Sequence, residues 1–213
     1  MAVNLTKGQR VSLKKDAPNL KRILVGLGWD PVEKKRGLFS LGSSAEDIDI
    51  DASVICIDEN GREKEIVYFG HKDDRAGSIH HTGDNLTGED DDDEEKQFTN
   101  SSNKVLKDDE QIIISLDKVP RDFAKLAIII NIYSAYSRKQ DFGQVKNCFC
   151  HVSDMDTNKE LVYYDISGNG NFNGLTGIFV AEIYRYNGDW RLKAEGDGVK
   201  VRDIKEMVRM KCR

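Results

Sequence analysis

The sequence contains no hydrophobic run long enough to cross a bilayer. A membrane-spanning helix needs about 20 mostly apolar residues, whereas the longest apolar stretch of this chain lies around Leu126 to Ile132. The opening residues, from Met1 to Lys7, also lack the apolar core of a secretory signal peptide. We therefore expect a cytoplasmic protein rather than a membrane or secreted one.

Residue types that carry redox, zinc or nucleophilic chemistry are also scarce. The chain has four cysteines and four histidines. Cys148 and Cys150 are too closely spaced for a zinc knuckle and there is no second pair, so we expect reduced structural thiols. No histidine lies in a Gly-x-Ser-x-Gly or His-Glu-x-x-His motif, which argues against an enzyme. His80 and His81 would suit a transition metal, but a turn is the simpler interpretation.

Aromatic residues make up only 8% of the chain and are spread through apolar segments. They are better explained as core than as a platform for stacking bases, so no nucleic-acid partner is expected. The formal charge is −5, and seven consecutive acids from Glu89 to Glu95 create this excess. Without that acidic run the charge balance reverses sign.

The segments that are present follow a β pattern, in which short runs rich in Val, Ile, Tyr and Phe alternate with Gly, Asn and Asp turns. Asn187-Gly188 is a strong hairpin signal, and a turn is expected at Asp156–Lys159. The run Ile128–Ile132 is typical of a central strand that is covered on both faces. The expected strands are Arg10–Lys14, Lys21–Leu27, Asp49–Ile57, Glu65–Phe69, Gln111–Leu116, Lys125–Tyr133, Gln144–Val152, Glu160–Ile166, Gly177–Tyr186 and Trp190–Ala194.

This pattern predicts an all-β fold, a two-sheet sandwich with a short C-terminal helix, in one domain over residues 1–213. The helix is expected at about 201–212, where Val201, Ile204, Met207 and Val208 share one face opposite Lys and Arg. An expanded acidic loop is expected at about 89–109, and a shorter loop at 38–46.

Three acids, Asp47, Asp49 and Asp51, alternate with apolar residues and so share one face of a strand. Farther along that face the residues become apolar, at Ile55 and Ile57. A strand that runs from a charged rim into a core would show this change. Like charges in a row repel unless something positive intervenes, and Ca²⁺ with its oxygen ligands would suit them. The alternative is a solvated acidic edge that prevents strand pairing.

A second group of oxygen-bearing side chains, Asp84, Asn85 and Glu89, lies in a glycine-rich turn, and Asp30 ends an apolar run. An EF-hand is excluded, because a loop opening at Asp47 would need Gly and Glu where Ala52 and Asp58 stand. Any calcium site must therefore be assembled across β-loops.

Taken together, these segments resemble the TerD family of bacterial tellurium-resistance and stress proteins. The matching segments occur in family order at 5–8 (LTKG), 25–30 (VGLGWD), 47–53 (DIDIDAS), 81–89 (HTGDNLTGE), 142–145 (FGQV) and 181–190 (AEIYRYNGDW). The resemblance implies a two-sheet β-sandwich, two calcium ions near one end and no known catalytic activity. It carries over as metal-site positions Asp30, Asp47, Asp49, Asp51, Asp84, Asn85 and Glu89.

The chain departs from the family after Glu89, where the family pattern continues Gly-Asp-Gly-Asp-Asp-Glu and enters a strand. We interpret 90–107 as an insertion, and Asp108, Asp109 and Glu110 as the counterparts of that acidic segment. The alternative places Asp91 and Asp93 in the site.

The leading hypothesis is a calcium-binding, non-enzymatic scaffold of the stress response. Its partners would be calcium and other stress-response proteins, at the inner membrane surface if they are membrane-associated. The alternative is calcium-dependent binding to an anionic membrane surface or phosphorylated partner, because residues 1–22 and 198–213 are rich in Lys and Arg. No residue in the sequence suggests a chemical mechanism for tellurium resistance.

Overall fold

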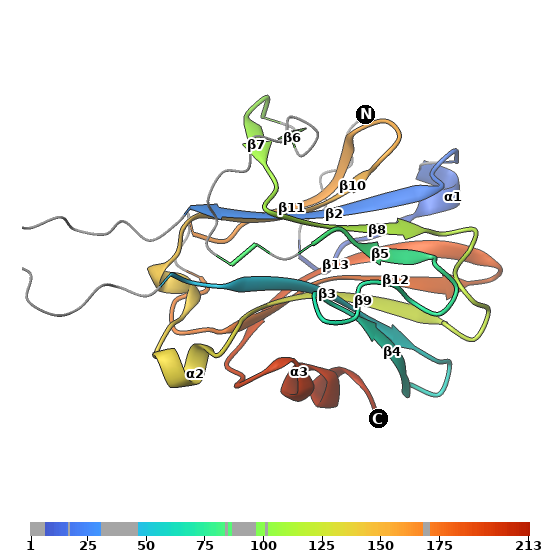
Figure 1. Cartoon of the computed structure of the whole chain (residues 1–213). Coiled ribbons are helices and arrows are strands. Elements are labelled where there is room, and N and C mark those ends of the chain that lie inside the picture. The colour runs from blue at the N-terminus through green and yellow to red at the C-terminus, as the bar shows by residue number, and fades with distance from the viewer. Residues whose placement is uncertain are drawn as a thin grey trace, which may run out of the picture.

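The computed structural model describes residues 7–16, 18–30, 47–83, 85–86, 97–100, 102–167 and 171–213. Over these ranges most of the chain is strand (Figure 1). The strands are β1 (Arg10–Ser12), β2 (Arg22–Asp30), β3 (Ile50–Ile57), β4 (Glu63–Val67), β5 (Ile79–His81), β6 (Gln97–Thr99), β7 (Val105–Lys107), β8 (Glu110–Ser115), β9 (Lys125–Ile132), β10 (Lys146–Asp154), β11 (Lys159–Asp165), β12 (Gly177–Tyr186) and β13 (Asp189–Val199). The helices are α1 (Leu13–Asp16), α2 (Ala135–Arg138), the 3-10 helix η2 (Phe142–Gln144) and α3 (Ile204–Lys211).

Two antiparallel sheets lie face to face, which confirms the predicted β-sandwich (Figure 1). Sheet A has the strand order β1-β13-β12-β9-β3-β4, and sheet B has the order β11-β10-β2-β8-β5. A small hairpin, β6–β7, pairs only with itself among the described strands. Its Phe98 and Leu106 pack on Phe149 and Tyr163, so the hairpin covers part of the outer face of sheet B.

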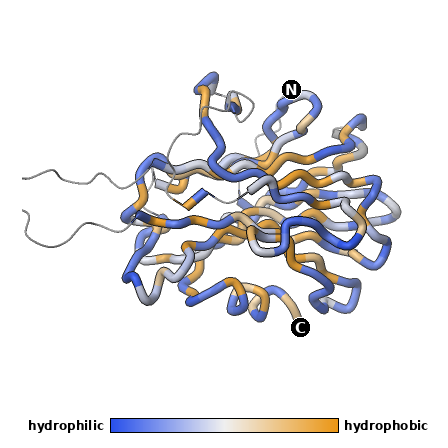
Figure 2. Tube along the Cα trace, viewed as in Figure 1, coloured by the Kyte–Doolittle hydropathy of each residue, from blue (hydrophilic) through white to orange (hydrophobic). Residues whose placement is uncertain are grey.

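The core lies between the sheets, where strand alternation brings one face of each strand inward. In β3 the inward residues are Ala52, Val54 and Cys56. Strand β9 sits between β12 and β3 and is buried from Leu126 to Ile132, which confirms the prediction of a central strand. Figure 2 shows the hydrophobic residues concentrated along the strands of both sheets.

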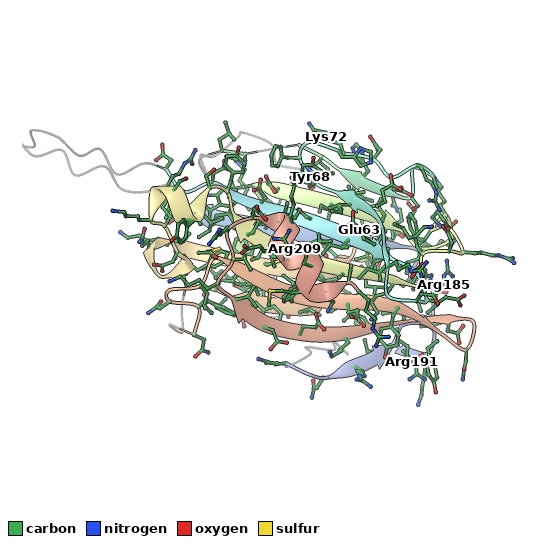
Figure 3. All side chains as sticks on the ribbon, turned by 90° about the horizontal axis from the view of Figure 1, so that it is seen from below. Glu63, Tyr68, Lys72, Arg185, Arg191 and Arg209 are labelled. Atoms are coloured by element: carbon green, nitrogen blue, oxygen red, sulfur yellow. The ribbon has the colours of Figure 1, made fainter. Side chains whose placement is uncertain are left out.

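The outer face of sheet A is covered by α3, as Figure 3 shows from that side. Met207 and Val208 of α3 pack on Ile55 and Ile57 of β3, so the predicted apolar helix face and the apolar end of the β3 face are both confirmed. The helix begins with an N-cap, in which the Asp203 side chain accepts a hydrogen bond from Glu206 N, and the Glu206 carboxylate accepts one from Arg202 N, just before the cap.

Both predicted turns are present. Asn187 and Gly188 join β12 to β13 with φ values of 51° and 80°, the left-handed conformation that a tight hairpin requires. Strand β10 pairs with β11 up to Asp154 and Lys159, across a turn in which Asn158 has φ 56°.

The structure differs from the prediction in several short elements. Strand β5, helix α2 and the hairpin β6–β7 were not expected, and the hairpin lies inside the segment 89–109 that was predicted to be loop. The first expected strand ends at Ser12, where α1 begins. The loop predicted at 38–46 and the acidic run itself lie outside the described residues. No helix in the described ranges is long and apolar enough to span a bilayer.

Two methionines of α3 allow a matched test of its packing. Met207 is 0% exposed and Met210 is 59% exposed. We predict that Met207→Ala lowers the free energy of unfolding by about 2–5 kcal/mol, because it removes a fully buried side chain and leaves a cavity. Met210→Ala should change it by less than about 0.5 kcal/mol. Urea denaturation measures both, and equal losses would show that α3 does not pack on sheet A in this way.

Candidate metal-binding end of the sandwich

Glu110 is a fully buried carboxylate at one end of the sandwich. It begins β8 and shares a face with Ile112 and Ile114 of the core, so its side chain enters the space between the sheets. Its Oε2 accepts a hydrogen bond of 2.8 Å from the backbone N of Ala52 in sheet A. The same oxygen lies 3.5 Å from Nε2 of His81, which is also fully buried. Glu110 therefore joins the two sheets at this end.

Asn85 and Asp109 lie beside Glu110. The backbone N of Asn85 donates to Glu110 Oε1 at 3.4 Å, and its Nδ2 donates to Asp109 Oδ1 at 3.2 Å. Asp109 Oδ2 accepts from the backbone N of Trp29 at 2.8 Å. Three of the predicted site residues thus converge, and we call Asn85, Asp109 and Glu110 the inner cluster.

Asp51 occupies a different face. It belongs to β3, whose neighbouring residues Ile50 and Ala52 point into the core between the sheets, so Asp51 lies on the outer side of sheet A. Asp47 and Asp49 precede the first residue of β3, and Asp49 and Asp51 are both buried. Asp51 lies opposite Asn131 of β9, whose Nδ2 donates to Asp51 Oδ2 at 3.4 Å. Only Asp51 of the predicted row lies within the strand, and its face is not the one on which Glu110 lies.

Asp108 lies in a third environment, on the outer side of sheet B. Nε2 of His151 is 3.1 Å from each Asp108 carboxylate oxygen, and both side chains are fully buried. Gln111 Nε2 also donates to Asp108, at 2.9 Å. The ring of Phe98, from the β6–β7 hairpin, stacks on His151 at 3.7 Å. Asp108 was expected beside Asp109 and Glu110, but its partners are those of a buried histidine–carboxylate pair beneath the hairpin.

Gly26 makes this pair possible. It lies opposite His151 in the register of β2 and β10. A Cβ atom at Gly26 would overlap both the His151 ring nitrogen and the Asp108 carboxylate. Neither Gly26 nor His151 was singled out for a role in the sequence, because a lone histidine in an apolar strand carries no distinctive signal.

The remaining predicted positions are scattered or undescribed. Asp30 ends β2 at an exposed position, where it accepts a hydrogen bond of 2.6 Å from Asn147 Nδ2. Asp84 and Glu89, and the alternative positions Asp91 and Asp93, lie outside the described residues. Within the described ranges, no three His, Cys, Asp or Glu side chains are grouped closely enough to hold one metal ion.

Each of the four histidines lies against a carboxylate. Besides the two buried pairs, His71 contacts Glu65 at 3.0 Å and His80 contacts Asp73 at 2.7 Å. His80 is exposed and His81 is buried, because neighbours on a strand point to opposite faces. The two histidines therefore do not share one ion in the way that a transition-metal pair would.

All four cysteines are free, as predicted. Cys56, Cys148 and Cys150 are buried, and their burial raises the pKa of each thiol above its ordinary value. These thiols are therefore protonated and structural at neutral pH.

Several basic residues at the two ends of the chain lie in ion pairs. Lys211 contacts Glu195 at 2.6 Å and Glu182 at 3.1 Å beneath α3. Against the opposing effect of burial, these two acids raise the pKa of the Lys211 ammonium group and keep it charged. Lys7 pairs with Asp197 at 2.7 Å, and Arg22 pairs with Asp156. These contacts neutralise part of the predicted basic surface.

The fold and this end of the molecule define a class, a two-sheet β-sandwich with buried carboxylates gathered at one end. A family model described as the TerD domain matches residues 1–210. The chain therefore belongs to the TerD family, the tellurium-resistance and stress-response type that the sequence motifs indicated.

Three relatives illustrate the similarity. The chain is 40% identical over 213 residues to stress response protein SCP2 of Bacillus subtilis (strain 168), with 98% of each protein covered. It is 34% identical over 201 residues to tellurium resistance protein TerD of Serratia marcescens, which covers 93% of this chain and 91% of that protein. The crystal structure of a telluride resistance protein (TerD) homologue from Streptomyces coelicolor matches with a TM-score of 0.68 and 21% identity, covering 89% of this chain and 98% of that one. This last match shows the fold alone.

The direct pairing of Asp108 with His151 can be tested by a double-mutant cycle. We predict that Asp108→Ala and His151→Ala each destabilise the fold, because each leaves a buried polar partner behind. The double variant should lose less than the sum of the two, with a coupling energy of about 0.5–3 kcal/mol in urea denaturation. Strict additivity would contradict the direct contact.

Proposed function

We propose that this protein binds Ca²⁺ at the inner cluster, and that the calcium-loaded sandwich serves as a non-enzymatic binding or scaffold module in the cytoplasmic stress response. The observation that carries the proposal is the inner cluster itself. It places the carboxylates of Asp109 and Glu110 and the amide of Asn85 together at a buried end of the fold.

The donor chemistry of the inner cluster fits calcium. Its side chains offer carboxylate and amide oxygens, which are the hard ligands that Ca²⁺ takes in groups of about 6–8. Burying carboxylates is costly unless positive charge compensates them, so a divalent cation would stabilise this end of the fold. Mg²⁺ prefers a strict octahedral shell that keeps several waters, which suits a mixed carboxylate and amide cluster less well.

The described residues supply only part of a calcium shell. Asp84 directly precedes Asn85 in the sequence and Glu89 follows it closely, so these two acids are the candidates to complete the first site. The row Asp47, Asp49 and Asp51 is the candidate for a second ion, because Asp51 lies on the outer side of β3, away from Glu110. Calcium in either place would act structurally, by cancelling carboxylate repulsion and fixing the end of the sandwich.

The relatives support the stress-response part of the proposal. One is named a stress response protein and another a tellurium resistance protein, and the chain matches each over more than nine-tenths of its length. The ion pairs of Lys7, Arg22 and Lys211 favour a binding module of this type over the alternative of docking on an anionic membrane or phosphorylated partner.

Calorimetric titration with Ca²⁺ and Mg²⁺ tests the proposal directly. Calcium should release heat with saturable stoichiometry, whereas Mg²⁺ should bind more weakly. A ligand that binds only the folded state at a hundred times its Kd adds about 2.7 kcal/mol of stability. For a chain of this size that corresponds to a rise in Tm of about 5–10 °C. The proposal fails if saturating calcium gives neither heat nor a rise in Tm.

Three neighbouring isosteric variants locate the site. Asp109→Asn and Glu110→Gln should each weaken calcium binding by at least about tenfold, because each removes a charged ligand at the cost of about 1.4 kcal/mol or more. Asp108→Asn is the matched control, since Asp108 is occupied with His151 on the other side of sheet B. If the control variant lost calcium as completely as the other two, the inner cluster would be the wrong site.

The acidic run gives a further prediction. Replacement of Asp90, Asp91, Asp92 and Asp93 with Asn should weaken calcium binding only modestly, by less than about tenfold. The difference should disappear at high salt, because the run would act through long-range attraction that ions screen. Complete loss of binding in this variant, measured by the same titration, would place the run in the site itself.

A further inference from the structure

A pocket opens on the outer face of sheet A, apart from the inner cluster. Its volume is about 400 Å³, within the range of small-molecule sites. It lies between β3, β9 and α2, next to the start of α3. Figure 3 views the molecule from this side and labels Tyr68, one of the lining residues. We call it the outer pocket.

Two buried oxygen atoms of the lining residues lack hydrogen bonds. Ser53 is 0% exposed and Asn131 is 5% exposed, and both line the pocket. Within the described part of the chain, Ser53 Oγ and Asn131 Oδ1 have no hydrogen-bond partner. Buried polar groups are nearly always paired, so two such atoms at one pocket indicate a bound group that supplies the missing bonds. The Asn131 oxygen only accepts, whereas the Ser53 hydroxyl donates as well as accepts.

The charged side chains that line the outer pocket are already engaged with described residues. Asp203 caps α3 by accepting from Glu206 N, and Arg202 lies 3.9 Å from the Glu206 carboxylate. Asp51 accepts from Asn131 Nδ2 and remains the candidate for the second calcium ion, so it takes no part in the inference. The two unpaired oxygens therefore require a neutral hydrogen-bonding group rather than a charge.

The pocket wall is aromatic. Tyr68 and Phe69 meet edge to face at 5.3 Å, and Phe69 and Tyr133 do so at 6.0 Å, so successive rings stand nearly perpendicular. Aromatic rings prefer this geometry, because the positive edge of one ring meets the negative face of the next. An aromatic ligand would extend the same pattern. A sugar would suit this wall less well, because two unpaired oxygens are too few partners for its many hydroxyl groups.

Two exposed rings give a route from solvent to the buried oxygens. Tyr133 and Tyr136 line the pocket and are 44% and 67% exposed. Exposed side chains change rotamer within picoseconds to nanoseconds, so these rings can move aside. Ser53 and Asn131 belong to the paired strands β3 and β9, which hold their positions fixed. A small ligand can therefore enter past the two tyrosines and reach both oxygens.

We infer that the outer pocket binds a small neutral phenol, with its ring against Tyr68, Phe69 and Tyr133. Its hydroxyl group donates to Asn131 Oδ1 and accepts from the Ser53 hydroxyl, so one group of the ligand satisfies both oxygens. A phenol is uncharged at neutral pH, which agrees with the lack of an unpaired charge in the pocket. The inference does not depend on calcium, because no acid of the two candidate calcium positions makes these contacts.

The test is a titration of the full chain with phenol, followed by NMR chemical shifts in the presence of EDTA so that calcium does not contribute. Anisole keeps the ring and lacks the hydroxyl donor, whereas cyclohexanol keeps the hydroxyl and lacks the aromatic ring. Phenol should bind saturably and about fivefold or more tightly than either probe, because each probe loses one of the two interactions. Equal affinity for either probe would overturn the inference. The absence of saturable phenol binding would overturn it as well, and would assign the two oxygens to a buried water.

Variants locate the binding. Ser53→Ala removes the hydroxyl and should weaken phenol binding by about two- to tenfold. It should not lower Tm, because the hydroxyl makes no hydrogen bond within the described part of the chain. Tyr133→Leu removes one ring of the wall and should weaken phenol binding severalfold.

Ser153→Ala is the matched control. Ser153 is also 0% exposed and its hydroxyl also lacks a partner among the described residues, but it lies in β10 of sheet B. This variant should leave phenol binding unchanged. Unchanged phenol affinity in Ser53→Ala or in Tyr133→Leu would contradict the outer pocket as the site, and so would a loss in Ser153→Ala as large as that in Ser53→Ala.

Discussion

The burial of the Glu110 carboxylate between the sheets is the constraint on which this end of the molecule depends. A carboxylate without water must receive hydrogen bonds or a counter-charge, and Glu110 receives hydrogen bonds from the backbone N of Ala52 in the opposite sheet and from the backbone N of Asn85. To reach those donors, β3 and β8 must lie at a fixed separation and register. The position of Asn85, and of the Asp109 carboxylate that it contacts, follows from that arrangement. A cation at this cluster would strengthen a contact between sheets that the fold already requires.

Much of the fold follows from local patterns in the sequence. The alternation in β3 identified its two faces, and the apolar run in β9 identified a strand covered on both sides. The Asn187-Gly188 turn was predictable because its left-handed φ values favour those residues. The missed elements β5, β6, β7 and α2 have three or four residues each, too few for a periodicity to appear. The β6–β7 hairpin is held by Phe98 against His151, a contact between residues far apart in the sequence that no local pattern announces.

The candidate site was predicted in composition but not in arrangement. Asp108, Asp109 and Glu110 are consecutive, yet each has a different environment. Asp108 contacts His151 beneath the β6–β7 hairpin, Asp109 contacts the Asn85 amide, and Glu110 lies between the two sheets. Strict alternation would place Asp108 and Glu110 on one side, but β8 begins only at Glu110, so alternation does not extend back to Asp108. Of the row from Asp47 to Asp51, only Asp51 lies within β3, and its place on the outer side of sheet A depends on how the two sheets pack. The tertiary structure decides which of these acids meet, so the amino-acid sequence around them does not predict it.

Strand β3 brings the two candidate calcium positions within one residue of each other. The backbone N of Ala52 donates to Glu110 on one side of sheet A, while the neighbouring Asp51 lies on the other. Adjacent residues on one rigid strand cannot shift independently. If binding at one site changes the affinity of the other through β3, binding at that other site must change the affinity of the first by the same factor. The strand is thus a shared thermodynamic element, through which an ion on its inner side and an ion on its outer side would each change the affinity of the other.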